Sequence, residues 1–309
     1  MDFELSLDQR AIVEAVEALL AQHAGPARAI ELAKKAEYDA ALDAALSEAG
    51  FLEVALGPET GLLEAALVVE AVARAGGVVS IGASALVAPG VAGRVLPGPV
   101  ALAQAGARGP VRFGAHARTL LVDAGEEARI ATLAPGDAAP VRSNFMFPLA
   151  RLAVDSRGGE SLGPGSGERL RRLWRLSLAA ESLGAMSAAL DVTLDYVKRR
   201  RQFGRAIGSF QAVQHRLAQC KILVEGTRWL SFEAAARGAP AEATALAAAH
   251  ATHAAGQVFA ETHQLTGAMG FTHEHDLHVF SMRLQALRLE LGGASAHLRA
   301  LAATRWPAG

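Results

Sequence analysis

Apolar residues recur every three or four positions over most of the chain, the spacing that places side chains on one face of an α-helix. In residues 1–95 the first such stripe comprises Leu7, Ile12, Val16, Leu19 and Leu20. Asp8 offers an N-cap for this helix, and further helices are predicted over residues 39–49 and 62–75. We therefore predict an N-terminal helical domain over residues 1–95.

The pattern changes in residues 96–160, where short apolar runs are bounded by Gly, Pro and Asp. Six of the twelve prolines lie between Pro97 and Pro148, and the runs at 100–102, 111–113 and 120–122 are only three residues long. Such runs are typical of short strands joined by tight turns. We predict a small, reduced β domain over residues 96–160, with a Gly/Ser/Pro linker at 158–167.

The helical pattern returns over residues 168–309, where we predict a C-terminal helical bundle. One helix carries the stripe Leu183, Met186, Leu190, Leu194 and Val197. It ends in four consecutive cations at 198–201, which suit the partial negative charge of a helix C-terminus, and Gly204 is predicted to break it. Arginine beside a glycine turn could bind a diphosphate. Four solvated cations would give the same pattern.

The composition indicates a folded core without a strong overall charge. Of the 309 residues, 51% are hydrophobic and 20% are charged, and the net charge is −1. We therefore predict no binding to nucleic acid. The apolar runs are interrupted by polar residues, so no membrane insertion is predicted. Asp2 and Glu4 stand where a cationic leader would begin, and the single Cys220 excludes an intrachain disulfide. These features favour the cytoplasm.

The turn between the first two helices of the predicted bundle contains a specific sequence motif. It contains Arg200, Gln202, Phe203, Gly204, Ile207, Phe210 and Gln211. This stretch resembles the signature of the flavin-dependent acyl-CoA dehydrogenase family. The resemblance implies a C-terminal four-helix bundle in which Arg200 reaches across a subunit interface to the pyrophosphate of FAD. That FAD would be held mainly by the neighbouring subunit.

A second motif lies at the end of the following helix. Gln264, Gly267 and Gly270 resemble a family segment whose backbone lies against FAD across the interface, with Ala268 where the family has a further glycine. The resemblance thus implies seven cofactor-binding residues: Arg200, Gln202, Phe203, Gln211, Gln264, Gly267 and Gly270.

The family's catalytic base has no counterpart in the sequence. The resemblance places this glutamate at Gly292 or, in a minority of members, at Trp174. Glu290 lies two residues from Gly292, about 200° around a helix, and is expected to point elsewhere. The segments that grip the flavin ring are also missing from residues 97–160. We therefore predict no catalytic residue in this chain.

These departures resemble the short, base-less subunits of heteromeric acyl-CoA dehydrogenases. The resemblance implies a heterotetramer in which a full-length partner supplies the base and most of the FAD site. Its activity would be α,β-dehydrogenation of an acyl-CoA thioester in lipid metabolism, with bulky substrates such as sterol side chains. One alternative is a homo-oligomeric dehydrogenase using Glu290, Glu274 or Glu261 as base. Another is a non-enzymatic helical scaffold or binding protein of the same fold.

A cluster of imidazoles near the C-terminus invites a metal interpretation. His273, His275 and His278 are accompanied by two carboxylates. Their spacing, H-x-H-x-x-H, fits neither a helical histidine pair at i, i+4 nor a familiar zinc site. We therefore predict no metal.

Overall fold

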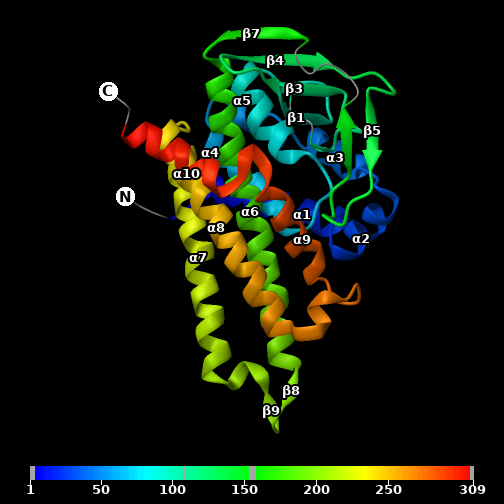
Figure 1. Cartoon of the computed structure of the whole chain (residues 1–309), viewed down its shortest axis with the longest axis vertical. Coiled ribbons are helices and arrows are strands. Elements are labelled where there is room, and N and C mark those ends of the chain that lie inside the picture. Colours follow the sequence, from blue (N-terminus) through cyan, green and yellow to red (C-terminus); the bar gives the residue numbers. More distant parts are fainter. Residues whose placement is uncertain (1–3, 107–108, 153–157, 307–309) are drawn as a thin grey trace.

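The long helix α6 (Ser166–Arg199) runs through the length of the protein, and the other elements pack around it (Figure 1). The structure is a computed structural model that describes residues 4–106, 109–152 and 158–306. Helices make up the N- and C-terminal parts, and short strands lie between them at one end of α6. This order confirms the predicted mainly helical fold with a small β region.

Among the N-terminal helices, α4 packs most closely against α6, and α1 packs in turn against α4. Their bounds are α1 Leu7–His23, α2 Pro26–Lys35, α3 Ala40–Glu48, α4 Leu62–Arg74 and α5 Ala88–Ala92, with short helices η1 Val54–Leu56 and η2 Gly82–Val87. The N-cap of α1 is Ser6, which exchanges hydrogen bonds with Gln9 in a capping box. The predicted N-cap, Asp8, is therefore wrong. Asp8 lies in the first turn, where its charge suits the helix dipole.

The middle strands form two small sheets. The first has the order β1-β3-β4-β7 and the second the order β2-β6-β5. Their bounds are β1 Val100–Gln104, β2 Val111–Arg112, β3 Thr119–Asp123, β4 Glu127–Thr132, β5 Ala138–Val141, β6 Leu149–Leu152 and β7 Glu160–Pro164. Strands β1 and β3 are parallel, and the other pairs are antiparallel. Strand β7 lies inside the stretch predicted as a linker, so that prediction is wrong.

The C-terminal helices complete a bundle with α6. They are α7 Gln211–Ala236, α8 Ala241–Thr266, α9 Leu277–Leu287 and α10 Gly293–Arg305, with the 3-10 turns η3 Ile207–Ser209, η4 Gly267–Phe271 and η5 Glu290–Gly292. A two-stranded hairpin, β8 Arg201–Gln202 and β9 Arg205–Ala206, joins α6 to α7. Helix α6 thus ends at Arg199, before the predicted breaker Gly204, because Arg201 pairs in the hairpin instead of continuing the helix.

Small residues allow the helices around α6 to approach closely. A Cβ atom at Gly184 of α6 would collide with the carbonyl oxygen of Glu70 on α4. Ala179 of α6 packs with Ala247 and Ala251 of α8, all with at most 2% of their surface exposed. These contacts bring α4 and α8 onto two sides of α6 and fix where its polar side chains lie.

The last helix contains a buried histidine. His297 of α10 is 1% exposed, and neither ring nitrogen has a hydrogen-bond partner among the residues that the structure describes. Burial, with a smaller contribution from the charge of Arg175, lowers the pKa of His297 from 6.5 to about 4. The neutral form is therefore the one that the folded protein holds at neutral pH.

This histidine should make the protein less stable in acid. Because the folded-state pKa is below the unfolded value, its contribution is complete above pH 6.5 and is lost as the pH falls towards 4. When the pH is lowered from 7 to 5, the free energy of unfolding should fall for the wild type. For His297→Gln we expect this decrease to be smaller by on the order of 2 kcal/mol. Urea denaturation at both pH values measures this difference. The exposed-site variant His253→Gln should match the wild type's pH dependence, and an equal slope in all three proteins would contradict the assignment.

Candidate functional site

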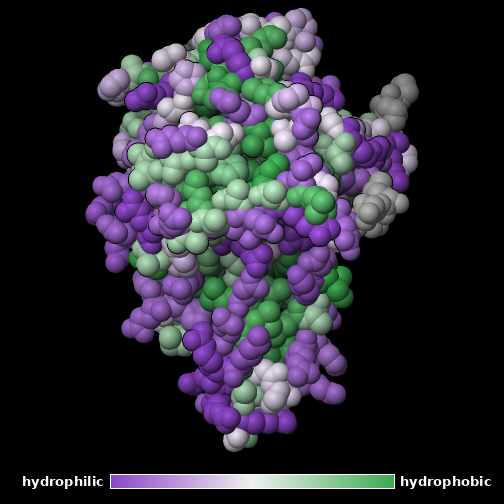
Figure 2. Space-filling model, turned by 180° about the vertical axis from the view of Figure 1, so that it is seen from behind, coloured by the Kyte–Doolittle hydropathy of each residue, from purple (hydrophilic) through white to green (hydrophobic). Residues whose placement is uncertain are grey.

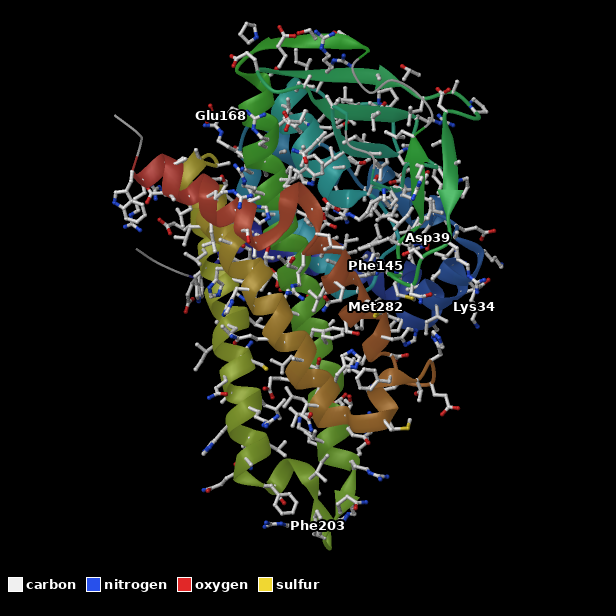
Figure 3. The ribbon with its side chains drawn as sticks, in the orientation of Figure 1. Lys34, Asp39, Phe145, Glu168, Phe203 and Met282 are labelled. Atoms are coloured by element: carbon white, nitrogen blue, oxygen red, sulfur yellow. The ribbon has the colours of Figure 1, made fainter. Side chains whose placement is uncertain are left out.

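The predicted cofactor-binding residues gather at the end of the bundle farthest from the β sheets. The turn from α6 to α7 and the turn that follows α8 both lie at this lower end (Figure 1). Phe203, labelled in Figure 3, marks its tip. The structure therefore brings together two motifs that are about sixty positions apart in the sequence. We call this end of the bundle, comprising residues 198–211 and 264–270, the bundle tip.

The hairpin at the bundle tip presents an aromatic ring outward. Phe203 and Gly204 are the two turn residues of the β8–β9 hairpin, with φ of 51° and 78°. Positive φ is unfavourable for a bulky side chain, yet Phe203 adopts it and is 90% exposed. Its ring meets the edge of Phe210 at 6.1 Å, and the guanidinium of Arg205 lies 4.0 Å from the Phe210 ring centre. Phe203 therefore presents its ring to the solvent at the bundle tip.

The cations of the bundle tip remain available to a ligand. The backbone of Arg200 accepts from Ile207 and donates to Tyr196, which holds the chain in place. Within residues 4–106, 109–152 and 158–306, the exposed guanidinium of Arg200 has no hydrogen-bond or ion-pair partner. Arg199 differs, because its Nε donates to the carbonyl oxygen of Asp195 at 3.1 Å. Arg200 is thus the better placed of the two to bind an anion.

The second motif is only partly open to a ligand. Gln264 is exposed in the last turn of α8, and Gly267 ends that helix with φ of 58°. Gly270 is buried, and a Cβ atom there would collide with the side chain of Thr266. Packing within the chain is therefore sufficient to explain the glycine at position 270. Gln264 and Gly267, in contrast, are exposed. Ala268 is exposed as well.

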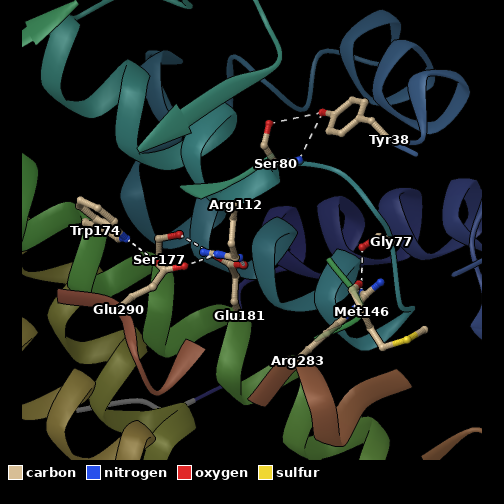
Figure 4. A network of polar contacts seen from close by, with 10 residues as sticks. All are labelled: Tyr38, Gly77, Ser80, Arg112, Met146, Trp174, Ser177, Glu181, Arg283 and Glu290. Carbon is tan, nitrogen blue, oxygen red and sulfur yellow. Dashed lines mark hydrogen bonds and ion pairs between the residues drawn. The ribbon is translucent and has the colours of Figure 1, made fainter. Parts of the chain in front are cut away.

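The two positions predicted for the family's base lie beside one carboxylate in the interior. Trp174 Nε1 donates a hydrogen bond of 2.6 Å to Glu290 Oε2, and Gly292 follows in the same turn as Glu290 (Figure 4). The prediction that Glu290 points elsewhere is wrong. Leu291 and Gly292 have φ of 49° and 82°, so the chain leaves the helical path here and regular helical spacing does not apply.

A buried arginine holds this carboxylate. Arg112 of β2 pairs through Nε with Glu290 and through its terminal nitrogens with Glu181 of α6, at 2.6 and 3.2 Å. Ser177 donates to Glu181 at 3.0 Å, and 11–17% of each charged side chain is exposed. Burial alone would lower the pKa of Arg112, but the two carboxylates outweigh it and raise that pKa above its usual value. We call these residues, with Trp174, the Arg112 network.

The sequence contained a signal for this network that the analysis of spacing did not use. Glu181 lies in a stretch of α6 that is otherwise Ala, Leu, Ser, Gly and Met, and a buried carboxylate needs a cation or a hydrogen-bond donor. Arg112 lies between Val111 and Phe113 in an apolar run. Either residue indicates a buried ion pair. Neither identifies its partner.

A second buried arginine lies next to the network. Arg283 of α9 is 2% exposed and donates to the backbone carbonyls of Gly76, Gly77 and Met146. Burial lowers its pKa to about 10, although the charge of Glu181 opposes this shift. Its guanidinium and that of Arg112 each lie 4.9 Å from the ring centre of Phe147. Arg283 therefore ties the N-terminal and middle parts to α9 through backbone carbonyls, and it has no ion-pair partner among the residues that the structure describes.

Very little free space remains around these residues. A cavity of about 20 Å³ borders Arg112, Glu181 and Glu290, and one of about 10 Å³ borders Arg283 and Phe147. Each has room for about one water molecule. A Cβ at Gly82 of η2 would lie 2.6 Å from Glu181 Oε1, so that side of the network is closed as well. Neither a flavin ring nor an acyl chain fits in these two cavities, but an open pocket of about 280 Å³ borders Arg112 and Glu290 on the side of Trp174 and Gly292.

Comparison with known proteins identifies the fold and the family. The model described as "Acyl-CoA dehydrogenase, N-terminal domain" matches residues 6–94, and "Acyl-CoA dehydrogenase, C-terminal domain" matches residues 172–306. The acyl-CoA dehydrogenase IpdE2 of Mycobacterium tuberculosis is 31% identical over 325 residues, which cover 97% of this chain and 98% of IpdE2. The chain belongs to the acyl-CoA dehydrogenase family.

Other members of the acyl-CoA dehydrogenase family match less evenly. FadE34 of M. tuberculosis is 35% identical over 223 residues, and this match covers 70% of the chain but 29% of FadE34. Among solved structures, a chain of the ChsE4-ChsE5 complex from M. tuberculosis aligns with this chain with a TM-score of 0.84 and 24% identity. The alignment covers 100% of this chain and 100% of that chain. A chain of the Tcur3481-Tcur3483 steroid ACAD G363A variant aligns with a TM-score of 0.84 and 25% identity, over 96% of this chain and 96% of that chain. FAD-dependent dehydrogenation is the general function of the family.

Other candidate groups have structural roles. The structure shows no cluster of three metal-binding side chains within its described residues. His275 meets the ring of Tyr196 edge-on at 5.3 Å, and His278 Nδ1 lies 2.9 Å from the carbonyl oxygen of His275. Cys220 is 1% exposed, and burial raises the pKa of its thiol to about 11, which makes it unreactive. No helix in the described part of the chain is long and apolar enough to cross a membrane.

Removing the cation of the Arg112 network should destabilise the fold strongly. Arg112→Met keeps most of the apolar stem but leaves Glu181 and Glu290 buried without their partner. We expect it to lower the free energy of unfolding by about 3–5 kcal/mol, measured by urea denaturation. Arg74→Met is the matched control, because Arg74 pairs with Asp191 on the surface and both side chains are about half exposed. That variant should lose less than about 1 kcal/mol. Equal losses would show that the network does not stabilise the fold.

Proposed function

We propose that this chain is the non-catalytic subunit of an FAD-dependent acyl-CoA dehydrogenase and lends cofactor contacts to a full-length partner. The observation that carries the proposal is the absence of a free base at the two positions that the family uses. Trp174 and Gly292 stand at these positions, and the neighbouring Glu290 is paired with Arg112 and accepts a hydrogen bond from Trp174. The base would therefore come from the partner subunit.

The bundle tip has groups that could contact FAD bound to the partner subunit. Bound FAD would supply the acceptor for the hydride that leaves the acyl thioester. Arg200 would donate charge-assisted hydrogen bonds to its diphosphate. Gln202, Gln211 and Gln264 are exposed at the same end of the bundle and offer amide groups. Phe203 would pack against the partner subunit.

An assembly of unlike subunits also agrees with the surface. Figure 2 shows hydrophobic surface on the lower part of the rear face, with hydrophilic margins. The described bundle includes exposed large apolar side chains, among them Ile222 at 70% and Phe271 at 73%. Extended apolar surface often marks a protein interface. The structural neighbours include complexes of two named chains, ChsE4-ChsE5 and Tcur3481-Tcur3483. We therefore propose a cytoplasmic heterotetramer acting on a bulky acyl-CoA.

The alternative of a homo-oligomeric dehydrogenase needs a base within this chain. Both oxygens of Glu290 already accept hydrogen bonds, from Arg112 and from Trp174, so the carboxylate is engaged within the protein. Glu261 pairs with Arg216 at 3.1 Å on the surface of the bundle, far from the vacant positions. Glu274 lies in the exposed turn before α9. These contacts favour the non-catalytic role.

The first test is the flavin content of the purified chain. Because the segments that grip the flavin ring are missing from residues 97–160, we expect the chain alone to carry far less than one FAD per chain, measured by absorbance near the flavin maximum. Co-expression with a full-length homologue should give about one FAD per pair of chains. One flavin per chain in the chain alone would support the homo-oligomeric dehydrogenase. No flavin in either preparation would support the scaffold protein.

The second test separates two neighbouring arginines at the bundle tip. Arg200→Ala should weaken FAD binding by the assembled enzyme about 10- to 100-fold, the loss of a charge-assisted hydrogen bond of about 1.5–3 kcal/mol. Arg199→Ala is the matched control and should change affinity only a few-fold, because Arg199 already binds the backbone of Asp195. Titration of the apo-complex with FAD measures both. Equal losses of FAD affinity in the two variants would contradict a specific role for Arg200 and would indicate a general basic surface.

A further inference from the structure

A wide groove lies on the β region, at the end of strands β3 and β4 that is away from α6. It has a volume of about 700 Å³. It is bounded by the segment 94–97, the turn 114–117, the adjoining ends of β3 and β4, the loop 133–136 and the starts of β5 and β7. We propose that this groove binds a small organic carboxylate with an apolar body, and that the carboxylate pairs with Arg118.

The groove is separate from the position of the family's base. Strands β3 and β4 are antiparallel, and the turn that joins them contacts α6, because the N–H of Gly167 donates to the carbonyl oxygen of Glu126. Thr119 and Thr132 pair at the opposite end of the two strands and line the groove. The five residues of β3 separate these ends by about 13 Å. Among the described residues, the groove shares no lining residue with the open pocket that borders the vacant base positions.

Hydrogen bonds fix the wall of the groove in place. The N–H of Leu133 donates to the carbonyl oxygen of Arg118 at 2.9 Å, which joins the loop after β4 to the start of β3. His116 Nε2 lies 2.9 Å from the carbonyl oxygen of Ala36, which holds the imidazole against the end of α2. A wall that is already ordered costs little conformational entropy when a ligand binds.

The size and lining of the groove determine the apolar part of the ligand. A volume of about 700 Å³ is within the usual range of small-molecule sites, which are mostly apolar. The larger apolar side chains of the lining are Leu96, Pro97, Ile130, Leu133 and Pro135. The other apolar lining positions are alanine or glycine, so they leave room for the body of a ligand.

One unpaired cation determines the polar part. The side chain of Arg118 is exposed and has no hydrogen-bond or ion-pair partner among the residues that the structure describes. Arg94 and Glu160 also line the groove, but they form an ion pair at 3.7 Å and their charges offset each other. The remaining single positive charge suits a monoanion, and the guanidinium can bind both oxygens of a carboxylate. A phosphate dianion would be repelled by Glu160 and by Asp137 in the adjoining loop.

This inference goes beyond the proposed subunit role and does not depend on it. The groove contains no residue of the bundle tip or of the Arg112 network except the neighbouring positions of the same sheets. A ligand there needs neither FAD nor a partner subunit. Failure of the binding test would therefore leave the flavin tests of the subunit role unaffected.

The experiment compares three probes of similar shape with the full chain alone. Equilibrium dialysis at pH 7 measures 2-naphthoate, 2-naphthol and 2-naphthyl phosphate, which present a carboxylate, a neutral hydroxyl and a phosphate. We expect 2-naphthoate to bind with a dissociation constant below about 1 mM. It should bind about tenfold more tightly than either other probe. Absence of 2-naphthoate binding at this concentration, or binding of either other probe at least as tight, overturns the proposal.

A charge variant tests the role of Arg118. Arg118→Gln should weaken 2-naphthoate binding about tenfold and leave 2-naphthol binding unchanged, because only the carboxylate loses its partner. Arg129→Gln is the matched control, since Arg129 of β4 pairs with Glu127 and does not line the groove. It removes the same charge from the same sheet and should change 2-naphthoate binding less than about twofold. Equal losses in the two variants would overturn the assignment to Arg118.

A second pair of variants locates the binding. Ala134→Trp places a large ring at an exposed position in the wall of the groove and should weaken the binding of 2-naphthoate at least about tenfold. Ala139→Trp adds the same ring at an exposed position of β5 outside the groove and should not change it. Unchanged binding in folded Ala134→Trp would overturn the location. If Ala134→Trp does not fold, the probe ratio in Arg118→Gln decides the proposal.

Discussion

The ion pairs of Arg112 are the contacts on which the arrangement of the chain depends. This guanidinium comes from a two-residue strand of the β region, and its partners come from α6 and from the turn before α10. Removing either sign would leave an uncompensated charge in the interior, so the three segments are stable only together. Arg283 adds hydrogen bonds to the N-terminal part at a neighbouring point. The region where helices and sheets meet is thus held together by charges.

The general layout of the fold could be predicted because periodicity reports burial directly. Stripes at helical spacing gave the helical N- and C-terminal parts, and short runs between Gly and Pro gave the strands. The errors were local. Strand β7 was missed because its residues, Glu160–Pro164, are turn-forming or polar and only their pairing with β4 makes them a strand. The early end of α6 depends on the hairpin pairing of Arg201.

The site was predictable only where its residues are close in sequence. The motif around Arg200 is continuous, and the structure places it at the end of the bundle as expected. The Arg112 network is not continuous, because Arg112 is 69 positions from Glu181 and 178 from Glu290. A charged residue in a sequence does not show whether water or another residue solvates it. The predicted direction of Glu290 relative to Gly292 was wrong because Leu291 and Gly292 both have positive φ, which breaks the helical spacing between the two positions.

Helix α6 carries Trp174 near one end and Arg199 at the other. Twenty-five residues of α-helix separate the two by about 38 Å. Sites so far apart, with no shared partners, usually respond to substitution independently. The residues around Trp174 can therefore change without disturbing the residues at the far end. The length of one helix thus allows the chemistry and the assembly of such a protein to evolve separately.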